Sequence, residues 1–143
     1  MSSDVDTDEC HACLCVAARR ASRAITRLFD REYRPHGIRA TQFTVLSMLN
    51  RGGPATIGVL AGAIGVERTT LTRNLARLEV RGWIKIAGSE EDGRSRIVSV
   101  TRKGRATLAA ALPAWRKAQS AAMAAIGDAG ATALRELSHK PIR

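Results

Sequence analysis

The sequence predicts a mainly α-helical protein with one small two-stranded β-sheet. Apolar residues recur every three to four positions over several stretches, which is typical of helices that bury one face. Two short β-prone runs, WIKIAG (83–88) and SRIVSVT (95–101), flank the polar loop GSEEDGRS (88–95), which predicts a hairpin with a charged tip. The 143 residues are enough for one core and too few for two full ones.

Two helices are expected in the N-terminal third. Apolar residues at 21, 24, 25, 28 and 29 have helical spacing and predict a long first helix that ends near Tyr33, before RPHG (34–37). The stretch ATQFTVLSMLNRGG (40–53) predicts a second helix of about two to three turns. Thr41 is its expected N-cap, and the helix is expected to end at Gly52 and Gly53.

Residues 55–84 predict two helices joined by a tight turn. Leu60, Ala61 and Ile64 mark a short apolar helix, and Gly65 supplies a turn position that tolerates positive φ. A new periodic run starts near Glu67, with leucines at 71, 75 and 78 facing inward, and ends at Gly82. Its outward side chains suit phosphates or base edges in a DNA major groove, and they are Arg68, Thr69, Thr70, Arg73, Asn74 and Arg77.

The C-terminal third predicts an Ala-rich helix from Lys103 to Ala125 that is bent or interrupted around Pro113. A short last helix follows Asp128, its expected cap. The positions expected to be buried are Leu108, Leu112, Trp115, Ala122 and Ile126, and the last helix carries Leu134 and Leu137.

Charge indicates the class of partner. Lys and Arg number 23 against 13 Asp and Glu, a formal net charge of +10, which favours a polyanion, with nucleic acid ahead of an anionic membrane surface. There is no apolar run of about 20 residues that could span a membrane, and the acidic start MSSDVDTDE is unlike a secretory signal. We therefore predict a cytoplasmic protein with no membrane partner. The chain carries no His-Glu-x-x-His or Gly-x-Ser-x-Gly motif, so we predict no catalysis and no cofactor.

A helix-turn-helix followed at once by a β-hairpin is the winged helix arrangement, and the order of parts resembles the MarR family of transcription regulators. The resemblance runs from about Cys15 to Leu137. Its most specific motif is DGRSRIVSVTRKG (92–104), in which Val100 replaces the usual Leu. LARLEVRGWI (75–84) and TQFTVLSML (41–49) match the end of the family's recognition helix and its second helix.

The resemblance implies a two-fold dimer whose recognition helices, here Glu67–Arg81, enter successive major grooves about 34 Å apart on a pseudo-palindromic operator. Arg94 at the wing tip would enter the minor groove, where negative potential favours a guanidinium, and Arg96 is a further candidate contact. Asp92 is expected to orient the wing by pairing with Arg77, because a carboxylate there would be repelled by DNA.

The predicted organisation has three parts: a flexible acidic leader (1–9), a helical dimerisation region (10–36 and 103–140) and a winged helix-turn-helix DNA-binding lobe (37–102). The predicted function is that of a homodimeric transcriptional repressor that binds double-stranded DNA. A small-molecule effector or thiol oxidation would release it from its operator. Two alternatives are a sequence-tolerant architectural DNA-binding protein and a thiol-dependent enzyme. A selective regulator should prefer its site by about 10³ or more over random DNA.

The stretch ECHACLC (9–15) contains every cysteine of the chain, Cys10, Cys13 and Cys15, with His11 among them. Three interpretations stay open: small buried residues, a thiol sensor and a metal site built from these four residues. Cys15 near a helix start and Arg19 resembles the reactive cysteine of the organic hydroperoxide regulators. The positions of that branch's thiolate-binding tyrosines correspond here to Phe29 and Ala40.

Overall fold

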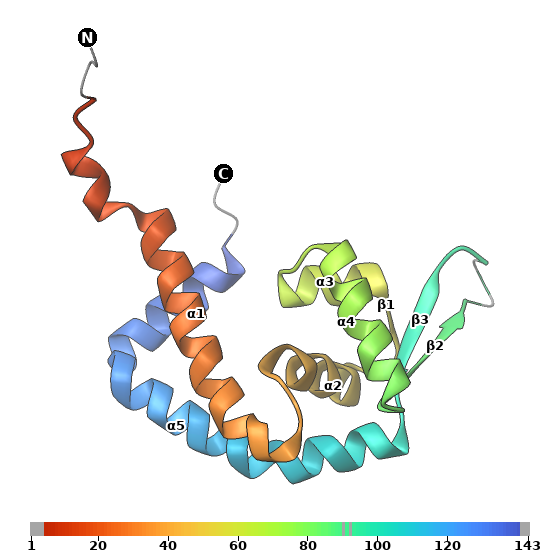
Figure 1. Cartoon of the computed structure of the whole chain (residues 1–143). Helices are drawn as coiled ribbons and strands as arrows, with labels where there is room; N and C mark the ends of the chain where they lie inside the picture. The colour runs from red at the N-terminus through yellow and green to blue at the C-terminus, as the bar shows by residue number, and fades with distance from the viewer. Residues whose placement is uncertain (1–4, 90, 92, 141–143) are drawn as a thin grey trace.

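A computed structural model describes residues 5–89, 91 and 93–140. Helices dominate it, as predicted, and one small sheet projects from the lobe that contains α2, α3 and α4 (Figure 1). The elements in chain order are η1 (Asp8–Ala12), α1 (Leu14–Tyr33), η2 (Arg34–His36), α2 (Ala40–Gly52), β1 (Ala55–Thr56), α3 (Ile57–Ile64), α4 (Arg68–Val80), β2 (Ile84–Gly88), β3 (Arg96–Val100) and α5 (Arg102–His139). In the described part of the chain, no helix combines the length and apolar character needed to cross a bilayer.

One core joins the helices of the lobe to the sheet. Leu46 of α2, Leu75 and Leu78 of α4 and Val98 of β3 have no exposed surface. Because these side chains come from three elements, their burial removes apolar area from water and fixes α4 against the rest of the lobe.

The aromatic side of this core lies where α1 meets α2. The rings of Tyr33 and Phe43 stack with centroids 4.8 Å apart, and Phe29 lies 6.0 Å from Tyr33. Burial, with a smaller contribution from the Asp30 carboxylate, raises the pKa of the Tyr33 phenol above its ordinary value. Tyr33 therefore remains a neutral core residue.

The sheet is antiparallel, with strand order β1-β3-β2. The predicted hairpin is confirmed: Ile84 pairs with Val100, and Ile86 pairs with Val98. The sequence did not indicate β1, which pairs Ala55 with Val98. Two residues are too short to show the alternation that marks a strand.

Thr41 is not the N-cap of α2, contrary to prediction. The helix begins at Ala40 after Arg39, whose backbone N–H donates to Oε1 of Gln42 at 3.0 Å. Asp30 accepts from the backbone N–H of Ala40 at 2.7 Å. A carboxylate ten residues away therefore satisfies a free donor at this helix end, so a local capping residue is not required.

The C-terminal helix is interrupted at Gly127, between the predicted Ala-rich helix and the predicted short last helix, and it is not interrupted at Pro113. Gly127 has φ 71° and ψ 171°, whereas Pro113 lies within the helix. Positive φ is accessible to glycine because it lacks a Cβ. Ile126, which was expected to be buried, is 38% exposed in the single chain, and Leu134 and Leu137 of the last helix are 45% and 57% exposed.

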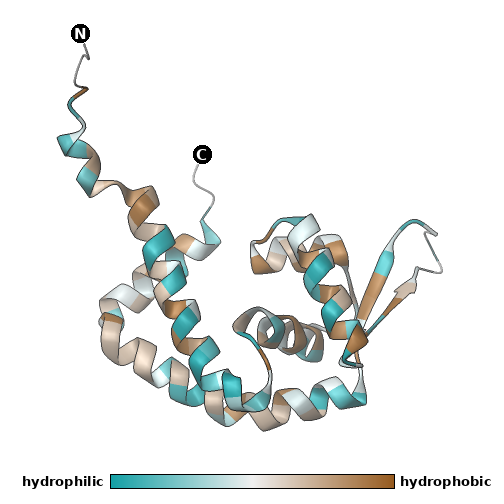
Figure 2. Ribbon diagram, viewed as in Figure 1, coloured by the Kyte–Doolittle hydropathy of each residue, from teal (hydrophilic) through white to brown (hydrophobic). Residues whose placement is uncertain are grey.

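α1 packs against α5, and the start of α1 and the end of α5 lie on the side of the molecule away from the sheet (Figure 1). Hydrophilic residues cover much of α1, whereas hydrophobic residues predominate in the middle of α2 and along the strands (Figure 2). The molecule thus has a winged lobe and an arm formed by the start of α1 and the end of α5.

Candidate nucleic-acid interface

The predicted helix-turn-helix is confirmed as α3 and α4. Thr56 caps α3 by accepting from the backbone N–H of Val59 at 3.2 Å, and Gly65 ends it with φ 76°. The turn reaches Glu67, the residue before α4. Leucines at 71, 75 and 78 then anchor the inner face of α4 in the core, which leaves its opposite face to solvent.

The outer face of α4 is cationic and rich in hydroxyl groups. Glu79 is the only acidic residue within this helix, and its Oε2 accepts from the backbone N–H of Ile86 at 2.8 Å. That carboxylate is therefore used to attach α4 to β2. The predicted DNA-contact side chains on α4 are exposed, except for the half-buried Asn74, and comprise Arg68, Thr69, Thr70, Arg73 and Arg77.

The wing consists of β2, β3 and the loop between them. The backbone N–H of Ser89 donates to the carbonyl of Ser95 at 2.8 Å and closes the base of the loop. Arg94 and Arg96 are exposed on this loop and strand. Asp92 lies outside the described residues, so its expected pairing with Arg77 stays a prediction.

Hydrogen bonds of Thr101 link the end of α4, the wing and α5, and the sequence analysis did not identify them. Thr101 donates through Oγ1 to the carbonyl of Gly82 at 2.6 Å and accepts from the backbone N–H of Gly104 at 3.0 Å. Its own backbone N–H donates to the carbonyl of Trp83 at 3.0 Å. A threonine immediately before a helix was the available signal for this cap.

Arg81 also has a role that the sequence analysis missed. Its guanidinium lies 4.0 Å from the centre of the Trp83 ring, and its Nη1 donates to the carbonyl of Gly37 at 2.9 Å. These contacts join the end of α4 to the loop before α2.

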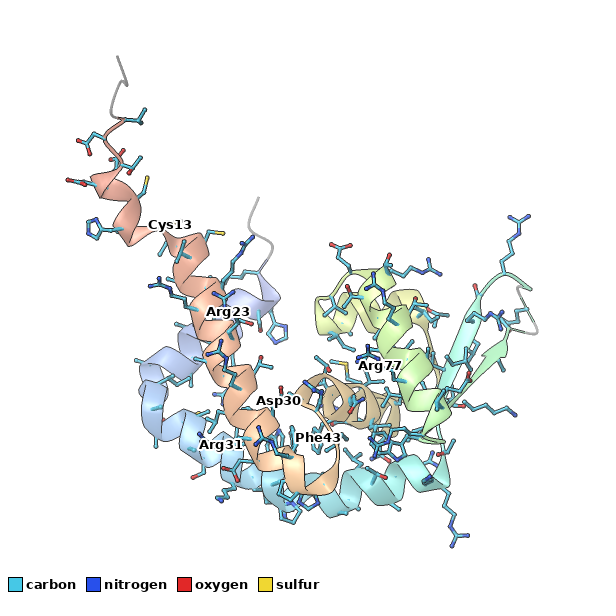
Figure 3. All side chains as sticks on the ribbon, viewed as in Figure 1. Cys13, Arg23, Asp30, Arg31, Phe43 and Arg77 are labelled. Carbon is cyan, nitrogen blue, oxygen red and sulfur yellow. The ribbon has the colours of Figure 1, made fainter. Side chains whose placement is uncertain are left out.

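The cysteine stretch lies at the far end of α1 from this lobe, as Figure 3 shows for Cys13 relative to Arg77. Cys10 and Cys15 are exposed and Cys13 is half-buried, so none is a fully buried core residue. Cys13 has φ −60° and ψ 116° between η1 and α1, and its N–H donates to the carbonyl of Cys10 at 3.1 Å. His11 bonds through Nδ1 to the carbonyl of Asp8. Among the residues that the structure describes, no three His, Cys, Asp or Glu side chains form a group that could hold a metal ion.

Known proteins are similar to this chain in architecture and in sequence. The sequence profile of the MarR family matches residues 36–95. The crystal structure of the M. tuberculosis transcriptional regulator MosR in complex with DNA is similar with a TM-score of 0.79 and 38% identity, over 88% of this chain and 93% of MosR. The chain belongs to the MarR family. This family consists of winged helix-turn-helix transcription regulators rather than enzymes.

Other transcription regulators are also similar to this chain. The regulator PecS of Dickeya dadantii is 33% identical over 62% of this chain and 55% of its own length, so that alignment spans about half of PecS. The repressor NicR of Pseudomonas putida is 27% identical over 87% of this chain and 78% of its own. A mutant MarR from E. coli, complexed with operator DNA, shares the fold with a TM-score of 0.79 at 22% identity.

Proposed function

We propose that the protein is a homodimeric repressor that binds a pseudo-palindromic operator and is released by a small molecule or by thiol oxidation. The observation that carries this proposal is α4, whose apolar face is buried and whose cations and hydroxyls face solvent. MosR, similar over nearly its whole length, is described in complex with DNA, and NicR is described as a repressor.

In this proposal residues 37–102 form the DNA-binding lobe. The outer side chains of α4 contact the major groove, and Arg94 and Arg96 contact the adjacent minor groove, where narrow width focuses negative potential. Asp92 orients the wing. The major-groove set is Arg68, Thr69, Thr70, Arg73, Asn74 and Arg77.

Residues 10–36 and 103–140 form the dimerisation region in this proposal, with residues 1–9 as a leader. Its support is a set of apolar side chains exposed at the arm of the molecule, since such surface is usually covered by a partner. They are Leu14 at 83%, Val16 at 45%, Ile126 at 38%, Leu134 at 45% and Leu137 at 57% exposed. Both segments that carry them lie near the chain ends (Figure 1).

A cavity of about 470 Å³ between α2 and α5 supports release by a small molecule. Phe43, Leu112 and Trp115 line it, and Arg51 and Arg105 also contribute to its wall. This surface suits a small apolar anion, because the rings provide contact area and the guanidiniums provide charge. The cavity lies between α2 of the lobe and α5, so a bound ligand changes the position of the DNA-binding lobe relative to the long helix in this proposal.

The test of DNA recognition is fluorescence anisotropy of the reduced protein on the DNA upstream of its own gene and on random DNA at equal salt. Selective regulation requires a preference of about 10³ or more. A much smaller ratio would favour the architectural alternative. Turnover of hydroperoxide with a thiol reductant, abolished by Cys15→Ser, would instead indicate an enzyme.

Arg73→Ala should weaken operator binding and relax selectivity at individual base pairs. The expected loss is about 1–3 kcal/mol, or roughly 5- to 150-fold, because an arginine fork can pair with the edge of one guanine. Anisotropy on single-base operator variants measures this, with exposed Arg116→Ala on α5 as a charge-matched control. An equal loss on every sequence would reassign Arg73 to phosphate contact.

Cys15→Ser should retain operator binding after treatment with an organic hydroperoxide, whereas the wild type should lose at least about tenfold in affinity. Cys15 is exposed in the first turn of α1, so a hydroperoxide can reach its sulfur. The Cys15 sulfur attacks the peroxide, the O–O bond breaks, and the products are a sulfenic acid and an alcohol. Oxidation beside Leu14 and Val16 would disturb the proposed dimer surface. Wild-type binding that is indifferent to hydroperoxide would remove thiol sensing from the mechanism.

A further inference from the structure

An arginine-lined groove lies where α1 meets the start of α2, outside the helix-turn-helix. We call it the junction groove. Its volume is about 600 Å³, and its cationic wall comes from Arg27 and Arg31 of α1, Arg34 of η2 and Arg39 before α2. Residues 27, 31 and 34 are spaced by four and three positions, so they lie on the same side of the chain as α1 runs into η2.

The acidic groups near this groove already have partners. Asp30 lines the groove, but its Oδ1 accepts from the backbone N–H of Ala40 at 2.7 Å. Glu32 lies 3.0 Å from Nζ of Lys117 and 3.8 Å from Nε of Arg31. The residues that line the groove thus include four exposed arginines and one acidic residue, Asp30, which leaves a cationic surplus.

The chemistry of the junction groove favours phosphate over an aromatic ligand. Among the described residues no aromatic ring lines it, and the apolar Ile38 in its wall is only 2% exposed. Guanidiniums bind phosphate oxygens through paired N–H donors. This distinguishes it from the cavity beside Phe43 and Trp115.

The junction groove continues to the proposed DNA-reading helix. A second groove of about 570 Å³ shares Gly37 and Arg39 with it and is also lined by Asn74, Arg77 and Arg81. The hydrogen bond from Arg81 to the Gly37 carbonyl fixes the wall that the two grooves share. A cationic surface thus extends from α4 across the start of α2 to α1.

We propose that the junction groove binds the phosphodiester backbone of DNA that leaves the major groove occupied by α4. Arg39 and Arg34 make the nearer phosphate contacts, and Arg31 and Arg27 extend them along the strand. Phosphate contacts fix the register of a protein on DNA without reading sequence. This inference rests on the proposed DNA-binding function and adds a contact surface to it.

The experiment measures the salt dependence of operator binding by full-length wild type, Arg39→Ala, Arg34→Ala and the control Arg116→Ala. The slope of log K against log salt should become shallower by about 0.9 for each phosphate that the variant no longer neutralises, or about 1.8 in a two-fold dimer. Random DNA should show the same change. Circular dichroism melting checks folding, which these exposed side chains should leave intact, since Arg39 keeps its backbone bond to Gln42.

Slopes for Arg39→Ala and Arg34→Ala equal to that of Arg116→Ala would overturn this inference, while selective wild-type binding would leave the proposed regulator standing. Calorimetric titration with inorganic tripolyphosphate separates the two sources of phosphate. Tripolyphosphate binding that Arg39→Ala abolishes, with unchanged DNA slopes, would make the groove a small-anion site and also overturn the inference. Failure of the wild type to bind any DNA would overturn both proposals.

Discussion

Gly104→Ala is expected to lower the free energy of unfolding by about 2–3 kcal/mol, at the upper end of the cost of overpacking a core. A Cβ at Gly104 would lie 2.9 Å from Cγ2 of Val100 and 2.9 Å from the carbonyl carbon of Trp83, and closer still to the Trp83 oxygen. Backbone cannot rotate away as a side chain can. The start of α5 would have to move, which would strain the Thr101 bonds that join it to the wing.

Thermal unfolding at fixed protomer concentration measures this effect, because dimerisation makes the midpoint concentration-dependent. Gly62→Ala is the matched control. Gly62 lies inside α3, and an added Cβ would meet no atom within 4 Å. Alanine also favours helix, so the control should be neutral or stabilising by about 0.4–1 kcal/mol. Equal unfolding midpoints for the two variants would contradict the close approach of Gly104 to the Trp83 backbone.

Leu75→Ala should cost about 2–5 kcal/mol, the range for truncating a fully buried leucine. Leu75 has no exposed surface and lies on the inner face of α4, between Leu71 and Leu78. The variant removes apolar packing and leaves a cavity beneath the helix that presents the proposed DNA contacts. We expect a lower unfolding midpoint in urea and weaker DNA binding at temperatures near that midpoint.

Val80→Ala is the control for this change on the same helix. Val80 is 89% exposed, so its truncation removes almost no buried area and should alter stability by less than about 0.5 kcal/mol. A Leu75→Ala variant as stable as Val80→Ala would contradict the placement of Leu75 in the core.

Local pattern was sufficient to predict the helix-turn-helix and the hairpin. The leucines at 71, 75 and 78 gave the buried face of α4, and alternation around Ile84 and Ile86 gave the strand. Local sequence patterns did not predict the contacts in which a distant residue takes the place of a neighbouring one. Asp30 satisfies the start of α2 in place of the expected Thr41, and β1 exists because β3 pairs with it.

The sequence by itself determined the order of the elements, the positive charge and the polarity of α4, because these depend on periodicity within a dozen residues or on composition alone. Only the tertiary structure decided which distant residues meet. It placed Gly104 against Trp83, gathered Phe43 and Trp115 in one cavity and brought Arg39 together with Arg27 and Arg31. Such contacts follow from how helices pack and from backbone bonds between remote segments, and no local spacing encodes them.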